Sequence, residues 1–184
     1  IKNGKILLYV GRLEKEKSVG FLLKAFRHIY DKDQQANLVL VGDGGMKVGL
    51  EQLAQKLGIE KNVYFVGLID SAEINKAYAD ADIFVFASQT ETQGMVILEA
   101  LASGLPVVAV NDSVYDGIIK NKINGALVEA DPNQFAKACL EILSNSSYRE
   151  KLGDFASKSM QDFSISATAQ SFEKLYKKLI ARKQ

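Results

Sequence analysis

Cysteine, histidine, proline and tryptophan are scarce in this sequence of 184 residues, which has one cysteine, one histidine, two prolines and no tryptophan. A single cysteine excludes an internal disulfide framework, and a single histidine excludes any site that needs several imidazoles. Cys139 shares helical spacing with Phe135, Ile142 and Leu143, so we expect a buried thiol rather than a reactive one. His28 has no Cys or Glu at metal-ligand spacing nearby, so we expect a surface or packing role.

Long apolar runs and an excess of one charge are missing as well. The sequence has no signal-peptide pattern and no apolar run long enough to span a bilayer, so the expected location is the cytoplasm. The 23 basic and 22 acidic side chains nearly cancel, so no whole-chain field favours nucleic acid or an acidic membrane as the main partner. The first residue is Ile1 rather than Met, and we expect the chain to be an excised fragment.

The hydrophobic content of 47% is enough for one globular domain over residues 1–184 without disulfide or metal support. Short β-branched runs alternate with amphipathic helical patterns, which predicts an α/β fold: a Rossmann-like, doubly wound parallel sheet of about six strands with helices on both faces. The expected strands are Ile6–Val10, Leu38–Val41, Val63–Val66, Ile83–Phe86, Val107–Val110 and Ala126–Val128. The expected helices are Val19–Tyr30, Lys47–Leu57, Ala72–Ala79, Gly94–Ser103, Tyr115–Lys120 and Pro132–Leu143, with extra C-terminal helices at Ser147–Met160 and Ser166–Ala181.

Two glutamates, Glu91 and Glu99, lie eight positions apart across the junction between the loop after the fourth strand and the next helix. Glu99 is about five residues into that helix, roughly 7 Å along its axis. Between them, the free N–H groups of Gly94, Met95 and Val96 would face an anion such as phosphate. Taken alone, the pair could be two surface acids. However, Glu99 stands in an otherwise apolar helix, where an unpaired buried charge is costly, so a sugar hydroxyl or a cation would explain it.

The loop after the first strand begins with Gly11 and carries Arg12 and Lys17, two cations five residues apart. Arginine supplies a bidentate contact and lysine a mobile point charge, so together they could clamp a diphosphate and neutralise a phosphate leaving group. The alternative is a solvated charged turn, because the same loop is rich in acids.

Two further loops follow the second and third strands. Gly42 lies in the first of them, a glycine-rich segment that lacks the G-x-G-x-x-G pattern of dinucleotide sites and could simply be a tight turn. Leu68 lies in the second, where the backbone could approach a nucleotide base or form only a turn and helix cap. Both loops gain interest because ligands bind beyond the carboxyl ends of parallel strands.

Taken together, these segments resemble the donor-binding, carboxyl-terminal domain of retaining, nucleotide-sugar-dependent glycosyltransferases with the GT-B fold. The resemblance covers nearly the whole chain. The matching segments are 11–17, 41–44, 63–67, 79–82, the E-x7-E pattern of 91–99, and 102–108.

The resemblance implies a role for each candidate residue. Arg12 and Lys17 would bind the donor diphosphate, Glu91 the transferred hexose and Glu99 the ribose, with Arg12, Lys17 and Glu91 as the catalytic residues. The amides of Gly94, Met95 and Val96 would complete phosphate binding, and the remaining donor-binding residues would be Gly11, Gly42 and Leu68. The nucleotide sugar is a substrate, so no cofactor is expected. The acceptor domain would be a missing amino-terminal half, without which this fragment should scarcely turn over.

One departure from the common pattern refines the resemblance. Gln93 stands where many relatives have an aromatic residue, a variant similar to bacterial diacylglycerol glucosyltransferases, and the turn 111–117 lacks the common Gly-Gly. The expected reaction is transfer of glucose from UDP-glucose to a lipid hydroxyl, such as that of diacylglycerol, with retention of configuration. No metal site is expected, since Asp80-Ala81-Asp82 reads as the end of a helix followed by a strand.

Other functions stay open at the level of sequence. A non-catalytic nucleotide-sugar-binding module would keep the same phosphate clamp, and a GT-B-type sugar-nucleotide epimerase would share the architecture. A receiver domain is disfavoured by length and by the missing acidic cluster after the first strand. The final helix has an apolar face with basic residues around it. It could contact the inner face of a membrane or pack against protein, and packing is the simpler expectation. Its basic residues are Lys174, Lys177, Lys178, Arg182 and Lys183.

Overall fold

A computed structural model describes residues 4–181 and contains one parallel sheet of six strands. The strands are β1 (Ile6–Val10), β2 (Asn37–Val41), β3 (Val63–Gly67), β4 (Ile83–Phe86), β5 (Val107–Val110) and β6 (Gly125–Val128). Their order across the sheet is β3-β2-β1-β4-β5-β6, and each neighbouring pair is parallel. The expected doubly wound parallel sheet is therefore confirmed, with strand ends within one residue of the predicted ones.

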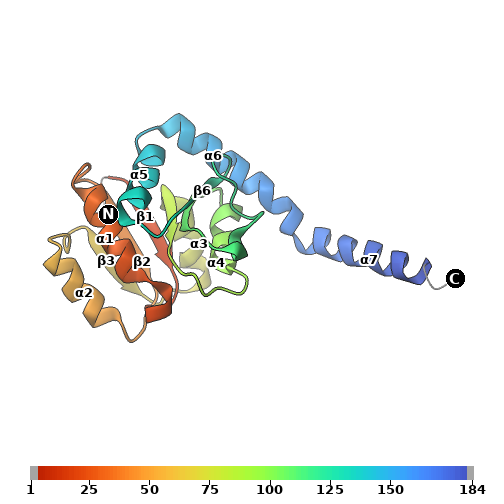
Figure 1. Ribbon diagram of the computed structural model, residues 1–184, viewed down its shortest axis with the longest axis horizontal. Coiled ribbons are helices and arrows are strands. Elements are labelled where there is room, and N and C mark those ends of the chain that lie inside the picture. Colours follow the sequence, from red (N-terminus) through yellow and green to blue (C-terminus); the bar gives the residue numbers. More distant parts are fainter. Residues whose placement is uncertain (1–3, 182–184) are drawn as a thin grey trace.

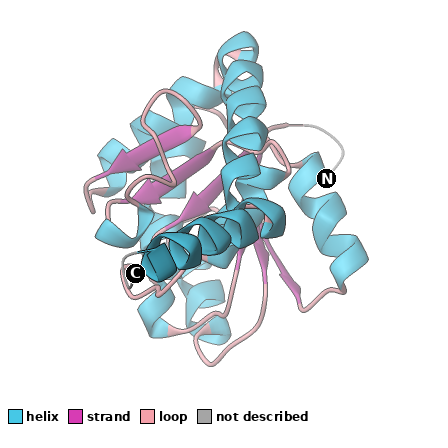
Figure 2. Cartoon of the chain, turned by 90° about the vertical axis from the view of Figure 1, so that its right-hand side faces the viewer, coloured by secondary structure: helices cyan, strands magenta, loops and turns pink. Residues whose placement is uncertain are grey.

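Helices cover both faces of the sheet (Figure 2). They are α1 (Val19–Tyr30), α2 (Lys47–Lys56), α3 (Ser71–Asp80), α4 (Met95–Ala102), α5 (Pro132–Leu143), α6 (Ser146–Ser159) and α7 (Ile165–Ala181). Three short 3₁₀ helices are η1 (Lys15–Lys17), η2 (Ser113–Tyr115) and η3 (Met160–Phe163). Right-handed crossovers put α1 and α2 on one face and α3 and α4 on the other. α5 returns to pack on α1, and α6 packs on α4.

Short side chains cap the helices where the sequence changes from loop to helix. The Asp70 carboxylate accepts hydrogen bonds from the amides of Ala72 and Glu73, which fixes the start of α3. Asp131 accepts from the amide of Gln134 at the start of α5. These bonds satisfy amides that the helices themselves leave without partners.

The core fills both sides of the sheet. Strands β4 and β5 are buried along their whole length, as expected for central strands of a sheet covered on two faces. Cys139 is fully buried on α5, and burial raises the pKa of its thiol, so the expectation of an inert core cysteine is confirmed. His28 is half-buried on α1.

The helix expected at Tyr115–Lys120 is wrong. The segment forms the short helix η2 and then a series of turns. Gly117 has a φ of 79°, which leaves the right-handed helical region. The Asn124 side chain donates to the Ile118 carbonyl and accepts from the Lys120 amide, so side-chain bonds replace the helical ladder.

The last helix, α7, projects away from the rest of the molecule (Figure 1). Within Ile165–Ala181 no side chain is buried. No helix in the described part of the chain is both long and apolar enough to cross a membrane. Arg182 and Lys183, which the sequence assigns to this basic helix, lie outside the described residues.

Candidate functional site

The candidate site lies where the strand order changes direction, between β1 and β4. In sheets of this kind, ligands bind in the crevice beyond the carboxyl ends of the two strands at this point. A pocket of about 230 Å³ occupies that position between the loop after β1 and the loop after β4, and we call it the β1–β4 pocket. It is lined by Val10, Gly11, Arg12, Lys17, Phe86, Glu91, Thr92, Gln93, Gly94, Met95 and Val96. A larger pocket of about 720 Å³ between α1 and α5 holds no residue singled out from the sequence.

The pocket brings together most of the residues singled out from the sequence, although they come from segments more than 70 positions apart. Those that line it are Gly11, Arg12, Lys17, Glu91, Gln93, Gly94, Met95 and Val96. Gly42, Leu68 and Glu99 do not line it.

Both candidate cations have acidic partners. Lys17 donates from Nζ to Glu91 Oε1 at 2.5 Å, and the two side chains are only 15% and 16% exposed. Arg12 bonds Glu16 at 2.8 Å, but its side chain is 67% exposed and can move. An anion entering the pocket would compete with Glu91 for Lys17. Because this pair is sheltered from solvent, its attraction is screened less than that of the Arg12 pair.

The start of α4 forms one wall of the pocket. Gly94 is the N-cap residue, with φ 60° and ψ 40°, and its carbonyl accepts the hydrogen bond of the Ile97 amide. The amides of Gly94, Met95 and Val96 precede that first helical bond, so the helix does not use them. They line the pocket together with Lys17, and the dipole of α4 adds partial positive charge there. The wall is suited to a phosphate group.

Gly42, in the loop after β2, lies directly against the loop after β1. A Cβ atom on Gly42 would lie 1.9 Å from the Gly11 carbonyl oxygen, so only glycine allows this approach. Nearby, the Leu13 amide donates to the Asp43 carbonyl, and Glu14 Oε1 accepts from the Gly45 amide at 2.9 Å. Gly42 therefore forms a tight turn against Gly11, and its expected contact with the donor stays a prediction.

Leu68 and Glu99 lie outside the pocket for different reasons. Leu68 is 81% exposed in the loop after β3 and is open to a ligand that extends beyond the pocket. Glu99 is exposed, so the expectation of a buried charge is wrong. On α4 the buried face is formed by Ile97, Ala100 and Leu101, and Glu99 lies on the side that turns away from the core. Its Oε2 accepts a hydrogen bond from the Tyr78 hydroxyl at 2.9 Å.

Three tyrosines near the site carry no motif that sequence reasoning could have recognised. The Tyr9 hydroxyl donates to the Arg12 carbonyl at 2.9 Å, and the Tyr115 hydroxyl donates to the Ser88 carbonyl at 2.7 Å. Burial first, and then the negative charge of Glu91, raise the pKa of both phenols. The third, Tyr78, donates a hydrogen bond from its hydroxyl to Glu99. A tyrosine in a strand or a buried helix is usually just a core residue. The feature that marks these three is therefore the hydrogen bond of each hydroxyl in the structure.

No group of three or more His, Cys, Asp and Glu side chains within residues 4–181 is arranged to hold a metal ion. Asp82 has a structural role, as expected. It accepts from the Ile6 amide at 2.8 Å and pairs with Arg149 at 3.2 Å and Lys5 at 3.4 Å. These bonds tie β1, β4 and α6 together at the end of the sheet opposite the pocket.

Comparison with known proteins gives a consistent picture. A family model described as "Glycosyl transferases group 1" matches residues 1–159. The alpha-monoglucosyldiacylglycerol synthase of Acholeplasma laidlawii is 32% identical, over 95% of this chain and 44% of its own length. The D-inositol 3-phosphate glycosyltransferase of Corynebacterium jeikeium is 33% identical, also over 95% of this chain and 44% of its own length. The chain thus spans less than half the length of these two curated relatives.

Among solved structures, the C-terminal domain of a glycosyl transferase group 1 family protein, LpcC, from Francisella tularensis superposes with a TM-score of 0.80. The two chains are 30% identical, and the match covers 88% of each. The similarity therefore extends over most of both chains.

Proposed function

Because the chain belongs to the glycosyl transferases group 1 family and has the GT-B fold, we propose that it is the donor-binding domain of a retaining hexosyltransferase. The proposed reaction transfers a hexose, in the first place glucose from UDP-glucose, to an acceptor hydroxyl. The observation that carries the proposal is the β1–β4 pocket, where Lys17 and Glu91 meet at the amino end of α4. The extent of the match to LpcC supports the assignment as a carboxyl-terminal domain whose acceptor-binding partner is a separate domain.

The chemistry of the leaving group fits the pocket. When the bond between the hexose and the diphosphate breaks, negative charge develops on the departing phosphate oxygen. Lys17, Arg12 and the free amides of α4 would stabilise this charge more strongly than the ground state, which is the condition for catalysis. Fixed protein charges and dipoles suffice for this task, so the proposal requires no metal ion and no cofactor.

The two glutamates have different proposed tasks. A diphosphate and a hexose are joined by one bond, so the residues that bind them should be neighbours, and Lys17 Nζ is 2.5 Å from Glu91 Oε1. Glu91 is therefore proposed to contact the hexose. Glu99, about one turn along α4, is proposed to contact the ribose at the other end of the donor. In this arrangement the glutamates do not flank the scissile bond, so they differ from the acid and nucleophile of a glycoside hydrolase.

The proposed acceptor rests on two curated relatives and on Gln93. The two curated relatives have equal coverage and nearly equal identity, yet one is named for a glucosyldiacylglycerol and the other for an inositol phosphate. Gln93, which lines the pocket, favours a lipid acceptor such as diacylglycerol through its resemblance to the glucosyltransferases of that class. A lipid acceptor would bring the full-length enzyme to the inner face of a membrane. Radiolabelled product analysis of that enzyme separates glycosylated lipid from an epimerised nucleotide or from no product.

Donor binding by the 184-residue chain tests the proposal directly. We expect UDP and UDP-glucose to bind in calorimetric titrations, and each of Arg12→Ala and Lys17→Ala to weaken UDP by about tenfold or more, because each removes a charge-assisted bond to phosphate. Lys15→Ala is a matched control: Lys15 lies on the same helix, η1, but does not line the pocket.

Two outcomes would contradict the donor-binding proposal. The first is a folded chain that binds neither UDP nor UDP-glucose. The second is an equal loss of affinity in Lys15→Ala and Lys17→Ala, which would indicate a diffuse effect of positive charge rather than a clamp.

A further inference from the structure

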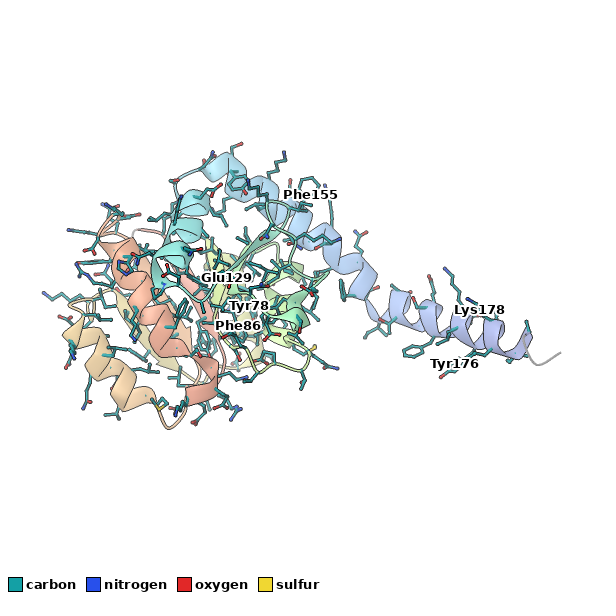
Figure 3. All side chains as sticks on the ribbon, in the orientation of Figure 1. Tyr78, Phe86, Glu129, Phe155, Tyr176 and Lys178 are labelled. Carbon is teal, nitrogen blue, oxygen red and sulfur yellow. The ribbon has the colours of Figure 1, made fainter. Side chains whose placement is uncertain are left out.

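Three buried tyrosine rings lie under the site, and each hydroxyl bonds a segment of it. Tyr9 and Tyr115 pack on Phe86 of β4, with ring centroids 5.9 and 6.4 Å away, and bond backbone carbonyls. Tyr78 packs on Phe84 at 5.9 Å and differs from the other two, because its partner is a side-chain carboxylate. Figure 3 shows Tyr78 and Phe86 inside the body of the molecule. The Tyr78 hydroxyl therefore links α3 to a carboxylate on α4.

Tyr78 is buried, whereas its hydrogen-bond partner Glu99 is exposed. Its side chain is 2% exposed, and its ring is fixed between α3 and the sheet. Glu99 is exposed, and a glutamate on a helix surface ordinarily samples several rotamers. Within residues 4–181 the Tyr78 hydroxyl is the one hydrogen-bond donor to the Glu99 carboxylate, at 2.9 Å from Oε2. The bond crosses from α3 to α4 and favours one orientation of the carboxylate.

We propose that Tyr78 is a positioning residue that holds the Glu99 carboxylate ready to accept hydrogen bonds from the ribose diol of the donor nucleotide. The inference rests on the proposed function, since it requires a nucleotide at this site. A carboxylate has about four acceptor positions, so the bond to Tyr78 leaves capacity for two ribose hydroxyls. A side chain that is already oriented loses less freedom when the ligand binds, which strengthens binding.

The protonation state of Tyr78 supports this role. Burial first, and then the hydrogen bond and charge of Glu99, raise the pKa of the phenol well above its ordinary value. The hydroxyl therefore keeps its proton throughout the physiological pH range and remains a donor to Glu99.

The test compares UDP with 2′-deoxy-UDP, which lacks one ribose hydroxyl, in calorimetric titrations of the 184-residue chain. We expect Tyr78→Phe, which removes only the hydroxyl, to weaken UDP binding three- to tenfold and to weaken 2′-deoxy-UDP by a clearly smaller factor, because only the 3′-hydroxyl of that ligand can still reach Glu99. In a Glu99→Gln background, Tyr78→Phe should cause no further loss, because the two residues act through one contact. Tyr148→Phe is the control for removal of a phenolic hydroxyl, because Tyr148 is half-buried on α6.

A second variant avoids any change in the core. Glu99→Asp keeps the negative charge but shortens the side chain, so the carboxylate withdraws from the Tyr78 hydroxyl. We expect it to weaken UDP about as much as Tyr78→Phe does. Thermal unfolding of each variant verifies that the chain is folded at the temperature of the titration.

The possible outcomes separate the inference from the proposed function. If the unmodified chain binds UDP but Tyr78→Phe and Glu99→Asp bind it equally well, Tyr78 does not position Glu99, and the proposed function stands. Equal weakening of UDP and 2′-deoxy-UDP by Tyr78→Phe would indicate a general disturbance of the site and would also overturn the inference. A folded, unmodified chain that fails to bind UDP overturns both.

Discussion

At the scale of single residues, the Lys17–Glu91 ion pair determines which ligand groups the pocket can bind. The two side chains neutralise each other at 2.5 Å in a place that is largely sheltered from water. A phosphate that binds Lys17 competes with Glu91 for the ammonium, and a carboxylate displaced in this way needs a new partner. A sugar hydroxyl can supply one. UDP-glucose supplies a phosphate to Lys17 and a sugar hydroxyl to Glu91, whereas free UDP supplies only the phosphate.

This difference predicts how two conservative variants respond to two ligands. Glu91→Gln removes the negative charge beside Lys17, so free UDP should bind at least as well as before, whereas the additional affinity for UDP-glucose should fall severalfold. Glu99→Gln should weaken both ligands, because both contain the ribose. Calorimetric titration of each variant with each ligand measures the four affinities. Equal losses for both ligands in both variants would show that the assignment of sugar and ribose ends is wrong.

At the scale of elements, the turn that opens α4 depends on a left-handed residue. Gly94 has a φ of 60°, and a Cβ atom there would lie 3.2 Å from Cε1 of Tyr115. Gly117 has a similar φ of 79°, but a Cβ atom there would meet nothing within 4 Å. A substitution at Gly117 therefore introduces backbone strain alone, whereas one at Gly94 introduces strain together with steric contact with the Tyr115 ring.

Alanine at these two positions should have different effects. Gly117→Ala should lower the free energy of unfolding by about 1–2 kcal/mol, the cost of placing a side chain in the left-handed region. Gly94→Ala should lower it further and also weaken UDP binding, because the ring contact shifts the amides that open α4. Urea denaturation and UDP titration measure the two effects. A Gly94→Ala variant that binds UDP normally would exclude these amides from phosphate binding.

The sequence predicted the elements well because most of their boundaries have local causes. The capping residues Asp70 and Asp131 and the apolar runs of the strands act within a few positions. The wrong helix at 115–120 had a non-local cause, since the bonds that replace it come from Asn124. Apolar spacing alone could not reveal a side chain that competes for the backbone.

The site was predictable to a similar extent and for a similar reason. Topology alone brings Arg12, Lys17 and Glu91 to one pocket, because β1 and β4 are neighbours in a sheet with this order. The exposure of Glu99 depends on which side of α4 meets the core. The hydrogen bond from Tyr78 to Glu99 depends on a contact between two helices, α3 and α4, that are separated in sequence. Neither property leaves a pattern in a single sequence.

At the scale of the whole molecule, α7 stands apart from the body that holds the sheet (Figure 1). Phe172 and Tyr176 stack at 6.3 Å on the helix itself, and both are more than half exposed. Figure 3 shows Tyr176 and Lys178 on opposite sides of α7. The helix thus has an apolar side and a basic side, and neither contributes to the core described above.

Removal of residues 165–184 should therefore leave the body intact. We expect the free energy of unfolding to change by no more than about 0.5 kcal/mol, as for other surface changes that remove no buried contact. UDP affinity should be unchanged, since α7 does not line the pocket. Urea denaturation of the chain ending at Ser164, alongside the complete chain, measures the difference. A loss of several kcal/mol would mean that α7 packs on the body in solution.

The order of strands also affects how the chain folds. β1 pairs with β2, which follows it closely, but it also pairs with β4, and Leu7 and its partner Ile83 are 76 positions apart. Closing this longer loop costs somewhat more entropy than closing the loop between β1 and β2, so we expect the early strands to associate before β4 pairs. We then expect the pocket between β1 and β4 to form after β1 and β2 have paired. During synthesis on the ribosome, ligand binding should begin only after α4 has emerged.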